Sequence, residues 1–373
     1  MNITAAVATE IGGSFTPQTV TLDDPAPDEV LVEIVGVGLC HTDLAAKDGH
    51  LPFPLPGVLG HEGSGVVNAV GSAVTKVGVG DKVVLSFNSC GRCTECRRSE
   101  PAYCHEFMAY NFGGVRPDGT STLHHDGEAL GAEFFGQSSF ATHAIAHERN
   151  VVKVDDDAPL AVLGPLGCGV QTGAGAVLNS LDCARGSRLL VLGGGSVGLS
   201  AVLAGVVREL VQIIVVEPHA ERRDLALSLG ATHVIDPTAG PLADQVRATA
   251  PGGVDYAIDT TGIADVLQQA MLTLAHRATV GIIGVPVDPE AALALNLIQA
   301  QVLGVRVIGI VEGDSDPDVF IPQLLELHRT GRFPFDKLIT FMPFTRINEA
   351  VAAQHRGEAV KIVLVHEQVE ELL

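Results

Sequence analysis

Residues 189–198 have the sequence Leu-Leu-Val-Leu-Gly-Gly-Gly-Ser-Val-Gly, and this stretch decides the fold class. An apolar run leads directly into glycines and then into a second apolar segment, which indicates a buried strand, a tight turn and a helix. Glycines in such a turn let backbone N–H groups approach a pyrophosphate, and the helix N-terminus adds partial positive charge. A purely structural glycine-rich turn is the alternative. We predict that five residues of the turn bind a dinucleotide: Gly193, Gly195, Ser196, Val197 and Gly198.

An acidic residue follows the next strand in the position that contacts the adenosine ribose. The strand Val211–Val216 ends at Glu217, about twenty residues after the glycine turn. A carboxylate there accepts hydrogen bonds from both ribose hydroxyls and repels a 2′-phosphate, which favours NAD over NADP. Arg222 and Arg223 weaken this preference because an arginine nearby can hold a phosphate, and Arg222 is a further candidate cofactor contact.

The order of expected strands and helices predicts an α/β chain with two domains. Before about residue 170 the apolar runs are short and β-like, as in Val30–Val35, Gly63–Val70 and Lys82–Leu85. From about Ala174 onward strands alternate with helical stretches, which predicts a doubly wound parallel sheet. The expected elements are Arg188–Leu192, Val197–Leu210, Gln212–Glu217, Ala220–Leu229, Val254–Asp259 and Ala278–Ile283, then a helix Val319–Arg329 and a closing strand Lys361–Val365. We therefore predict a domain of residues 170–310 inserted between residues 1–169 and residues 311–373.

Length and charge exclude several classes of function. The chain has 373 residues, too many for most single cores, and a formal net charge of -21. Such a surface repels nucleic acids and anionic membranes, so we expect neither as a partner. The uncharged run Leu189–Val207 is long enough for a membrane, but its glycines favour a buried strand, turn and helix. The N-terminus lacks the pattern of a signal peptide, so we expect a cytoplasmic protein.

Four cysteines in one short lobe, residues 88–105, indicate a structural zinc. Their spacing is Cys-x₂-Cys-x₂-Cys-x₇-Cys, and four thiolates make a closed tetrahedral site. An iron–sulfur cluster is the chemical alternative. The predicted ligands are Cys90, Cys93, Cys96 and Cys104.

Two further cysteines and one histidine are candidates for an open metal site. Cys40, His61 and Cys168 lie in glycine-flanked, turn-like segments, and two thiolates with one imidazole leave a fourth position for water or substrate. Thiolate ligands fit a reducing compartment, in which a disulfide framework is not expected. Cys183 has no partner in any motif and is expected to be a buried apolar residue.

Several motifs together give the chain a family resemblance over essentially its whole length. They are residues 38–43 (Gly-Leu-Cys-His-Thr-Asp), 60–63 (Gly-His-Glu-Gly), 164–169 (Gly-Pro-Leu-Gly-Cys-Gly), the four-cysteine lobe and the glycine turn. The chain resembles the zinc-dependent medium-chain alcohol dehydrogenase family, and residues 85–90, 134–140 and 333–336 make it most similar to the aryl, benzyl and geraniol dehydrogenases. The resemblance implies a GroES-like, β-rich catalytic domain formed by residues 1–169 and 311–373, and a Rossmann domain that binds NAD.

The resemblance also assigns roles around the open site. Cys40, His61 and Cys168 would hold a catalytic zinc, which with the structural zinc makes two per chain. Glu62 would assist ligand exchange, and Asp43 would accept a hydrogen bond from His61.

Thr42 would take the proton of the alcohol, and two positions depart from the family pattern near it. Many relatives continue the proton relay through a histidine where this chain has Ala45, so the proton must leave through ribose hydroxyls and water or through His50. Lys361 stands where relatives often have an arginine for the pyrophosphate, and it keeps the charge without the bidentate fork. His41 is a candidate second phosphate contact.

The expected activity is zinc-dependent, NAD-linked, reversible oxidation of primary aromatic or allylic alcohols to aldehydes. Phe134 and Phe87 would line an aromatic substrate pocket, with ordinary core packing as the alternative. Rival functions on the same scaffold are a zinc lyase, an aldehyde reductase and a thiol-adduct formaldehyde dehydrogenase. A non-enzymatic dinucleotide-binding protein would have lost an open-site ligand, and none is lost. The expected partners are a small alcohol or aldehyde and further copies of the chain, as a homodimer or homotetramer.

Overall fold

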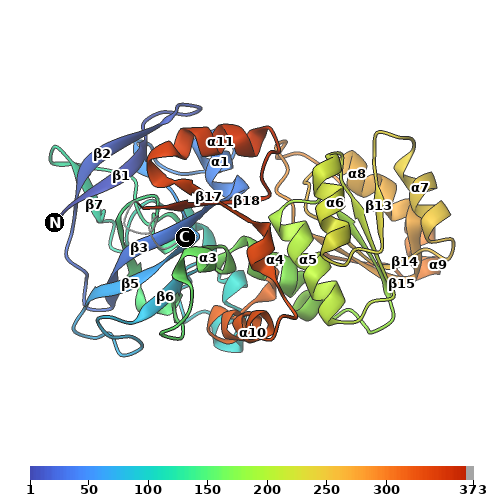
Figure 1. The fold of residues 1–373 in the computed structure, drawn as a ribbon, viewed down its shortest axis with the longest axis horizontal. Coiled ribbons are helices and arrows are strands. Elements are labelled where there is room, and N and C mark those ends of the chain that lie inside the picture. The colour runs from blue at the N-terminus through green and yellow to red at the C-terminus, as the bar shows by residue number, and fades with distance from the viewer. Residues whose placement is uncertain (367–373) are drawn as a thin grey trace. The chain divides into compact units, whose positions relative to one another are not determined.

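The computed structural model describes residues 1–366, which form two compact units (Figure 1). The first unit contains Met1–Gly169, Asp316–Leu324 and the chain from Ile339 onward. The second contains Val170–Ser315 and Leu325–Leu338. The predicted division after residue 310 therefore differs from the structure. Residues 325–338 join the second unit, where Arg332 Nη2 donates to Val207 O across 3.5 Å.

The first unit is built on two sheets. One has the strand order β4-β1-β2-β7-β8, and the other has the order β10-β6-β5-β3-β18-β17, with β9 also paired to β3. Burial differs between strands: β3 is buried along most of its length, whereas β2 carries several exposed residues. The strands are β1 (Asn2–Ala8), β2 (Phe15–Leu22), β3 (Glu29–Leu39), β4 (Gly57–Val58), β5 (Gly63–Val70), β6 (Lys82–Leu85), β7 (Leu123–His125), β8 (Glu128–Ala129), β9 (His143–His147), β10 (Val151–Lys153), β17 (Ile339–Pro343) and β18 (Lys361–Val365).

The C-terminal part of the chain returns to the sheet in which it began. Strand β18 pairs antiparallel with β3, with Ile362 opposite Leu39 and Val365 opposite Gly36. This pairing confirms the closing strand predicted at Lys361–Val365. It also places Lys361 beside the end of β3, from which the first candidate metal ligand follows.

The second unit contains a six-stranded parallel sheet with the order β13-β12-β11-β14-β15-β16. This order confirms the predicted doubly wound fold, in which ligands bind at the carboxyl edge where the strand order reverses. Its central strand is buried along Leu189–Leu192, as the continuous apolar run predicts. The strands are β11 (Arg188–Leu192), β12 (Gln212–Val216), β13 (His233–Ile235), β14 (Val254–Asp259), β15 (Leu274–Ile282) and β16 (Arg306–Gly309).

The helices differ in burial, from α5, most of whose residues are buried, to α9, which has no buried residue. They are α1 (His41–Lys47), α2 (Phe107–Phe112), α3 (Leu160–Leu163), α4 (Gly169–Gly175), α5 (Ser196–Val207), α6 (Ala220–Ser228), α7 (Leu242–Thr249), α8 (Ala264–Ala270), α9 (Leu297–Leu303), α10 (Pro317–Arg329) and α11 (Ile347–His355). Among residues 1–366, no single helix is long and apolar enough to cross a membrane, although the bent pair Leu160–Gly167 and Gly169–Ser180 passes that test together. The uncharged run Leu189–Val207 is mainly β11, the glycine turn and α5.

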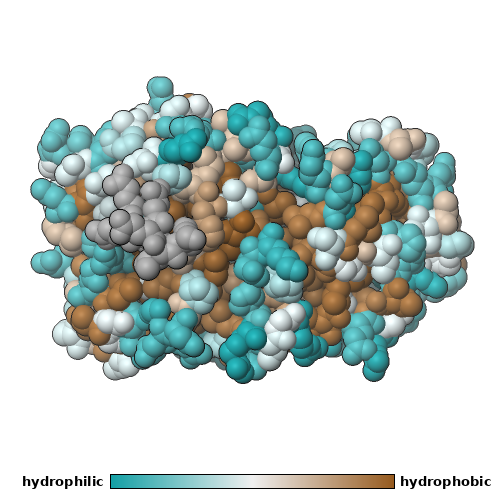
Figure 2. All heavy atoms as spheres, viewed as in Figure 1, coloured by the Kyte–Doolittle hydropathy of each residue, from teal (hydrophilic) through white to brown (hydrophobic). Residues whose placement is uncertain are grey.

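Each unit has its own apolar core. In the first unit Phe134, Phe140 and Leu59 belong to one large cluster of buried side chains. In the second, Leu190 and Ile214 pack with residues of the flanking helices, such as Val246. Figure 2 shows hydrophilic side chains interspersed with extensive hydrophobic areas on the face in view.

Candidate functional site

The first ligand segment is the junction of β3 and α1. Cys40 caps the helix, and its backbone N–H donates to Asp43 Oδ2 across 2.9 Å. This reciprocal arrangement satisfies the free N–H at the helix start and turns the Asp43 carboxylate back toward the cap. The same carboxylate accepts from Gly60 N at 3.1 Å, so it joins two segments of chain that are distant in sequence.

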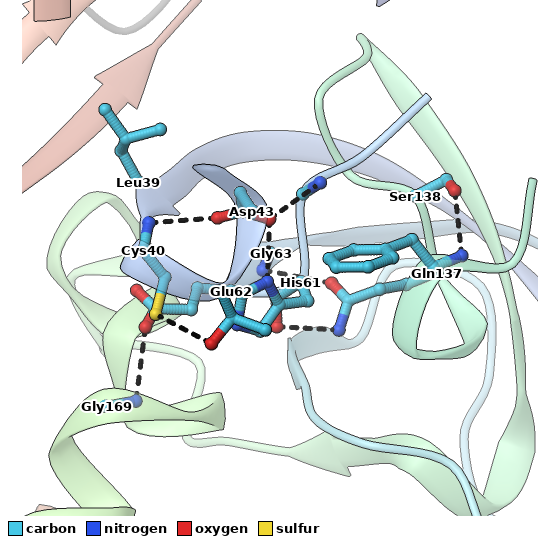
Figure 3. Close-up of polar contacts among 12 residues, drawn as sticks. Leu39, Cys40, Asp43, His61, Glu62, Gly63, Gln137, Ser138 and Gly169 are labelled. Atoms are coloured by element: carbon cyan, nitrogen blue, oxygen red, sulfur yellow. Dashed lines mark hydrogen bonds and ion pairs between the residues drawn. The ribbon is translucent and has the colours of Figure 1, made fainter. Parts of the chain in front are cut away.

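His61 follows Gly60, whose backbone brings the ligand segment close to the core. Gly60 has φ +91°, and a Cβ there would lie 2.4 Å from Phe140 N, so only glycine fits. The His61 ring is fully buried, and its Nδ1 lies 2.7 Å from Asp43 Oδ1 (Figure 3). An Nδ1–H donated to Asp43 leaves Nε2 as the atom with a free lone pair.

The residues of the open site fit a zinc ion. One ligand atom from each of Cys40, His61, Glu62 and Cys168 lies within 4.8 Å of the others. His61 Nε2 is buried and makes no hydrogen bond to any described residue. A buried nitrogen lone pair without a donor is costly unless a metal takes it. Two sulfurs and an imidazole are the donor set of an open zinc site.

Charges around this cluster shift the pKa values of two predicted ligands in opposite directions. The hydrogen bond from Cys168 and the positive charge of Lys361 outweigh burial and hold the pKa of Cys40 well below its usual range. Burial disfavours a charged His61, but the charge and hydrogen bond of Asp43 outweigh it and raise the pKa of the imidazole well above its usual range. The thiolate is the metal-binding form of Cys40, whereas a protonated His61 must lose one proton before its imidazole can bind a metal ion.

Lys361 and Glu62 form a buried ion pair next to the ligands. Lys361 Nζ lies 2.9 Å from both carboxylate oxygens of Glu62 and 3.2 Å from Leu39 O. Glu62 Oε1 also accepts from Gly169 N at 3.1 Å (Figure 3). Burial raises the pKa of Glu62, and Lys361 opposes this shift. Lys361, which the family resemblance predicts to contact the pyrophosphate, is thus paired with Glu62, the carboxylate beside the open site.

The residues proposed for proton transfer differ in exposure. Thr42 is half-buried, and its Oγ1 lies 3.8 Å from Cys40 Sγ. His50 and His41 are exposed, and His50 N donates to Ala45 O in the turn after α1. Of these groups, the Thr42 hydroxyl is the one in contact with a predicted ligand.

Aromatic side chains pack around the His61 ring. Phe135 is stacked on it with centroids 4.4 Å apart and planes at 26°, and Phe134 meets it edge-on at 5.4 Å. Phe134 is fully buried. Phe87 lies farther away and contacts Phe107 at 6.0 Å, which in turn meets Phe135 at 6.2 Å.

The four-cysteine lobe brings its sulfurs together. Ligand atoms of Cys90, Cys93, Cys96 and Cys104 lie within 4.8 Å of one another. Backbone N–H groups point at the sulfurs, as in Cys90 N to Cys104 Sγ at 3.2 Å and Cys93 N to Cys90 Sγ at 3.3 Å. None of the seven cysteines, all of which lie within residues 1–366, forms a disulfide.

The glycine turn of the second unit is shaped for a phosphate group. Gly193 has φ +100°, and a Cβ on Gly198 would lie 2.0 Å from Gly193 O, so both positions require glycine. A Cβ on Gly195 would meet nothing within 4 Å, which leaves open space at the start of α5. Ser196 Oγ is buried and has no hydrogen-bond partner among residues 1–366. A helix N-terminus with space and a spare hydroxyl fits a bound pyrophosphate.

Glu217 lies directly against this turn. Its Oε2 accepts from Gly194 N at 2.7 Å, and its Oε1 accepts from His219 N at 2.9 Å. Arg223, in contrast, donates to Glu217 O and Pro218 O and pairs with Asp236, so its guanidinium supports the backbone. Arg222 is half-buried on α6.

Two residues of the open site were missed by sequence reasoning. Phe135 stacks on His61, and Gln137 bonds to both neighbours of Glu62. Both belong to residues 134–140, a stretch in which the sequence predicts a site role only for Phe134. A run of aromatic and small polar residues carries no metal-binding pattern, so their roles became visible only with the folded loop.

The cluster of candidate zinc ligands and the glycine turn are together typical of a zinc-dependent dehydrogenase. Residues 26–156 match the family described as "Alcohol dehydrogenase GroES-like domain", and residues 196–327 match "Zinc-binding dehydrogenase". The chain is 49% identical to the geraniol dehydrogenase of Castellaniella defragrans over 97% of both proteins.

Solved structures agree with this relationship. The crystal structure of the benzyl alcohol dehydrogenase from Acinetobacter calcoaceticus matches with a TM-score of 0.95 and 41% identity, over 98% of this chain and 99% of that one. An alcohol dehydrogenase zinc-binding domain protein from Burkholderia ambifaria matches with a TM-score of 0.96 and 46% identity over the same shares. The chain belongs to the zinc-binding alcohol dehydrogenase family, as the sequence motifs predicted, and is an oxidoreductase of that class.

Proposed function

We propose that this protein is an NAD-dependent zinc alcohol dehydrogenase that interconverts primary aromatic or allylic alcohols and their aldehydes. The observation that carries the proposal is the cluster of Cys40, His61 and Cys168, in which His61 Nε2 is buried without a hydrogen-bond partner among residues 1–366 and Asp43 fixes the ring. Such a set leaves one position for the alcohol oxygen. The balanced reaction converts a primary alcohol and NAD⁺ to an aldehyde, NADH and a proton.

The residues of this chain divide the chemistry between them. A zinc ion bound here supplies Lewis acidity, which lowers the pKa of an alcohol. Thr42 Oγ1 accepts the alcohol proton and passes it on to solvent, because the chain has Ala45 where a relay histidine would stand. His50 is the alternative exit for the proton. Asp43 keeps the His61 ring in one tautomer through the 2.7 Å contact.

NAD, not NADP, is the proposed cofactor. Glu217 presents its carboxylate at the glycine turn, 2.7 Å from Gly194 N, where a 2′-phosphate would meet negative charge. Gly193, Gly195, Ser196, Val197 and Gly198 would hold the pyrophosphate. Lys361 and His41 are proposed as additional phosphate contacts on the strength of family resemblance, and Arg222 is proposed because an arginine near the ribose can hold a phosphate. Two zinc ions per chain and a homodimer or homotetramer complete the proposal.

Aromatic packing and the relatives' names support the substrate class. Phe134 lies edge-on to His61, and aromatic walls favour flat conjugated alcohols through burial and ring packing. Relatives named geraniol dehydrogenase and benzyl alcohol dehydrogenase cover nearly the whole chain. A thiol-adduct formaldehyde dehydrogenase or an aldehyde reductase remains the second candidate because it would use the same metal and cofactor sites.

A cofactor and substrate panel tests the proposal. We expect kcat/KM for benzyl alcohol or geraniol with NAD to exceed the values with NADP and with ethanol by at least about tenfold. Glu217→Ala should reduce the preference for NAD mainly by relieving repulsion of NADP. Asp236→Ala, which removes a nearby carboxylate engaged by Arg223, serves as the matched control. Equal efficiency with NADP would overturn the cofactor assignment, and equal efficiency with ethanol would overturn the substrate class.

A further inference from the structure

The loop of residues 133–138 has an unusually strained backbone beside the open site. Glu133, Phe135 and Ser138 have φ of 59°, 52° and 51°, and Gly136 has φ 64°. Left-handed conformations at non-glycine residues cost free energy and persist where the surroundings over-determine them. Such outliers are concentrated at functional sites, which directs attention to what this loop holds in place.

Gln137 is the residue of this loop whose side chain contacts the segment that contains His61. Its Nε2 donates to His61 O at 2.9 Å, and its Oε1 accepts from Gly63 N at 3.1 Å (Figure 3). The side-chain amide therefore forms hydrogen bonds to the backbone on both sides of Glu62. Gln137 is 2% exposed, so water does not compete for these bonds.

The same amide reaches toward the second ligand segment. Gln137 Nε2 also lies 3.2 Å from Ser86 O, and Ser86 Oγ donates to Gly167 O at 2.7 Å. Gly167 directly precedes Cys168. A continuous set of buried hydrogen bonds thus runs from the carbonyl of His61 through Gln137 and Ser86 to the residue before Cys168.

The loop itself is locked by further buried bonds. Phe134 N donates to Ser138 Oγ at 3.0 Å, and Ser138 Oγ donates to Val58 O at 2.6 Å. Asn150 Nδ2 donates to Gly136 O at 3.0 Å. With Phe135 stacked on the His61 ring, the loop contacts this ligand through both its ring and its backbone.

We propose that Gln137 is a positioning residue of the open metal site, fixing the distance between the His61 and Cys168 segments through Ser86. This inference rests on the proposed zinc site at Cys40, His61 and Cys168. Asp43 orients the imidazole plane, and Gln137 fixes the backbone from which that imidazole projects. Partners of this kind outside the ligand set typically change metal affinity or activity 10- to 100-fold when lost.

Metal release from the folded protein tests the proposal. The wild-type enzyme, Gln137→Met and Gln245→Met are mixed with a chromogenic zinc chelator well below their melting temperatures. Gln245 is a matched control because its Nε2 also donates to two backbone carbonyls, Asp236 O and Gly240 O, in the second unit. Methionine keeps the length of the side chain and removes its hydrogen bonds. We expect Gln137→Met to release one metal equivalent at least about tenfold faster than wild type, and Gln245→Met to stay within about twofold.

Cobalt substitution supplies a readout that general destabilisation does not move. The d–d spectrum of Co²⁺ in the open site should shift in Gln137→Met and stay unchanged in Gln245→Met, because only the former alters the ligand geometry. Wild-type release rates and an unchanged spectrum in Gln137→Met would overturn the proposal. A wild-type protein with a single metal equivalent would instead overturn the open zinc site itself.

A second variant keeps the test decisive if Gln137→Met does not fold. Ser86→Ala removes only the hydroxyl that reaches Gly167 and keeps the carbonyl that Gln137 uses. We expect it to accelerate release of the same metal equivalent by a smaller factor, about threefold or more. Release from Ser86→Ala at the wild-type rate would then reject the connection between the two ligand segments.

Discussion

Replacing Asp43 by asparagine should weaken the open metal site without unfolding the protein. Asp43 Oδ1 accepts from His61 Nδ1 at 2.7 Å and from Gly60 N at 3.1 Å, and Oδ2 accepts from Cys40 N at 2.9 Å. All three partners are donors, so the amide nitrogen of asparagine must face a donor in either orientation. One buried hydrogen bond to a charged acceptor is therefore lost, and the others lose their charge assistance.

The expected size of the effect follows from these contacts. A hydrogen bond to a charged group contributes about 1.5–3 kcal/mol, which corresponds to roughly a 10- to 100-fold change in an equilibrium constant. This range agrees with the usual cost of losing the carboxylate partner of a histidine ligand. We therefore expect the zinc affinity of the open site to fall about 100-fold in Asp43→Asn, with kcat/KM lowered at limiting metal.

A competition titration with a chelator measures that affinity directly. Asp48→Asn is the matched control, because Asp48 caps the C-terminal end of α1, whereas Asp43 lies in the first turn of that helix. The Asp48 carboxylate pairs with Lys47. Circular dichroism shows whether each variant is folded. Asp43→Asn with a zinc affinity within about twofold of wild type would refute the claim that this carboxylate holds His61 for a metal.

Three further predictions concern the other parts of the account. Cys168→Ala should abolish activity and leave the fold intact, whereas Cys93→Ala should lower the zinc affinity of the closed site at least about 100-fold and lower the melting temperature. Elemental analysis measures the zinc content and calorimetry the melting temperature of each variant. A wild-type protein with one zinc per chain, or with iron, would contradict this prediction. Thr42→Ala should lower kcat by roughly 10²–10⁴ with an altered pH profile, and His50→Gln by no more than about twofold, since that side chain is exposed; an unaffected Thr42→Ala enzyme would reject this proton route. Burial raises the pKa of Glu133 from 4.5 to about 7, so the folded state holds this proton more tightly and loses roughly 3 kcal/mol of stability as the pH rises from about 4.5 to above 7. Glu133→Gln should flatten that loss in urea titrations at several pH values, and an unchanged slope with pH would show that the carboxyl ionises normally.

The sequence predicted the regular elements well wherever local pattern decides them. Apolar runs bounded by glycine and charged residues gave β5, β6, β11, β14 and β18 with the observed bounds. The ends of the helices were less accurate. The helix predicted at Val197–Leu210 spans Ser196–Val207, because helix ends depend on caps and packing.

Contacts between distant segments could not be predicted from pattern. Lys361 and Glu62 are far apart in the chain, and only the pairing of β18 with β3 brings the ammonium to the carboxylate. The proposed role of Gln137 could not be predicted because it depends on hydrogen bonds to the backbone of His61, Gly63 and Ser86. These bonds form only in a loop with left-handed residues on either side of Gln137. Candidate metal ligands could be named from the sequence because zinc requires a few residue types at recognisable spacings, and the structure brings the donor atoms of both predicted sets together.

The most direct test of the central claim is benzyl alcohol-dependent formation of NADH before and after removal of the labile zinc. We predict that purified enzyme oxidises benzyl alcohol with NAD, that chelation of one zinc equivalent abolishes this activity while the protein stays folded, and that added zinc restores it. Activity that persists after the labile zinc is gone, or an enzyme with two zinc ions that does not reduce NAD with any benzylic or allylic alcohol, would contradict the account.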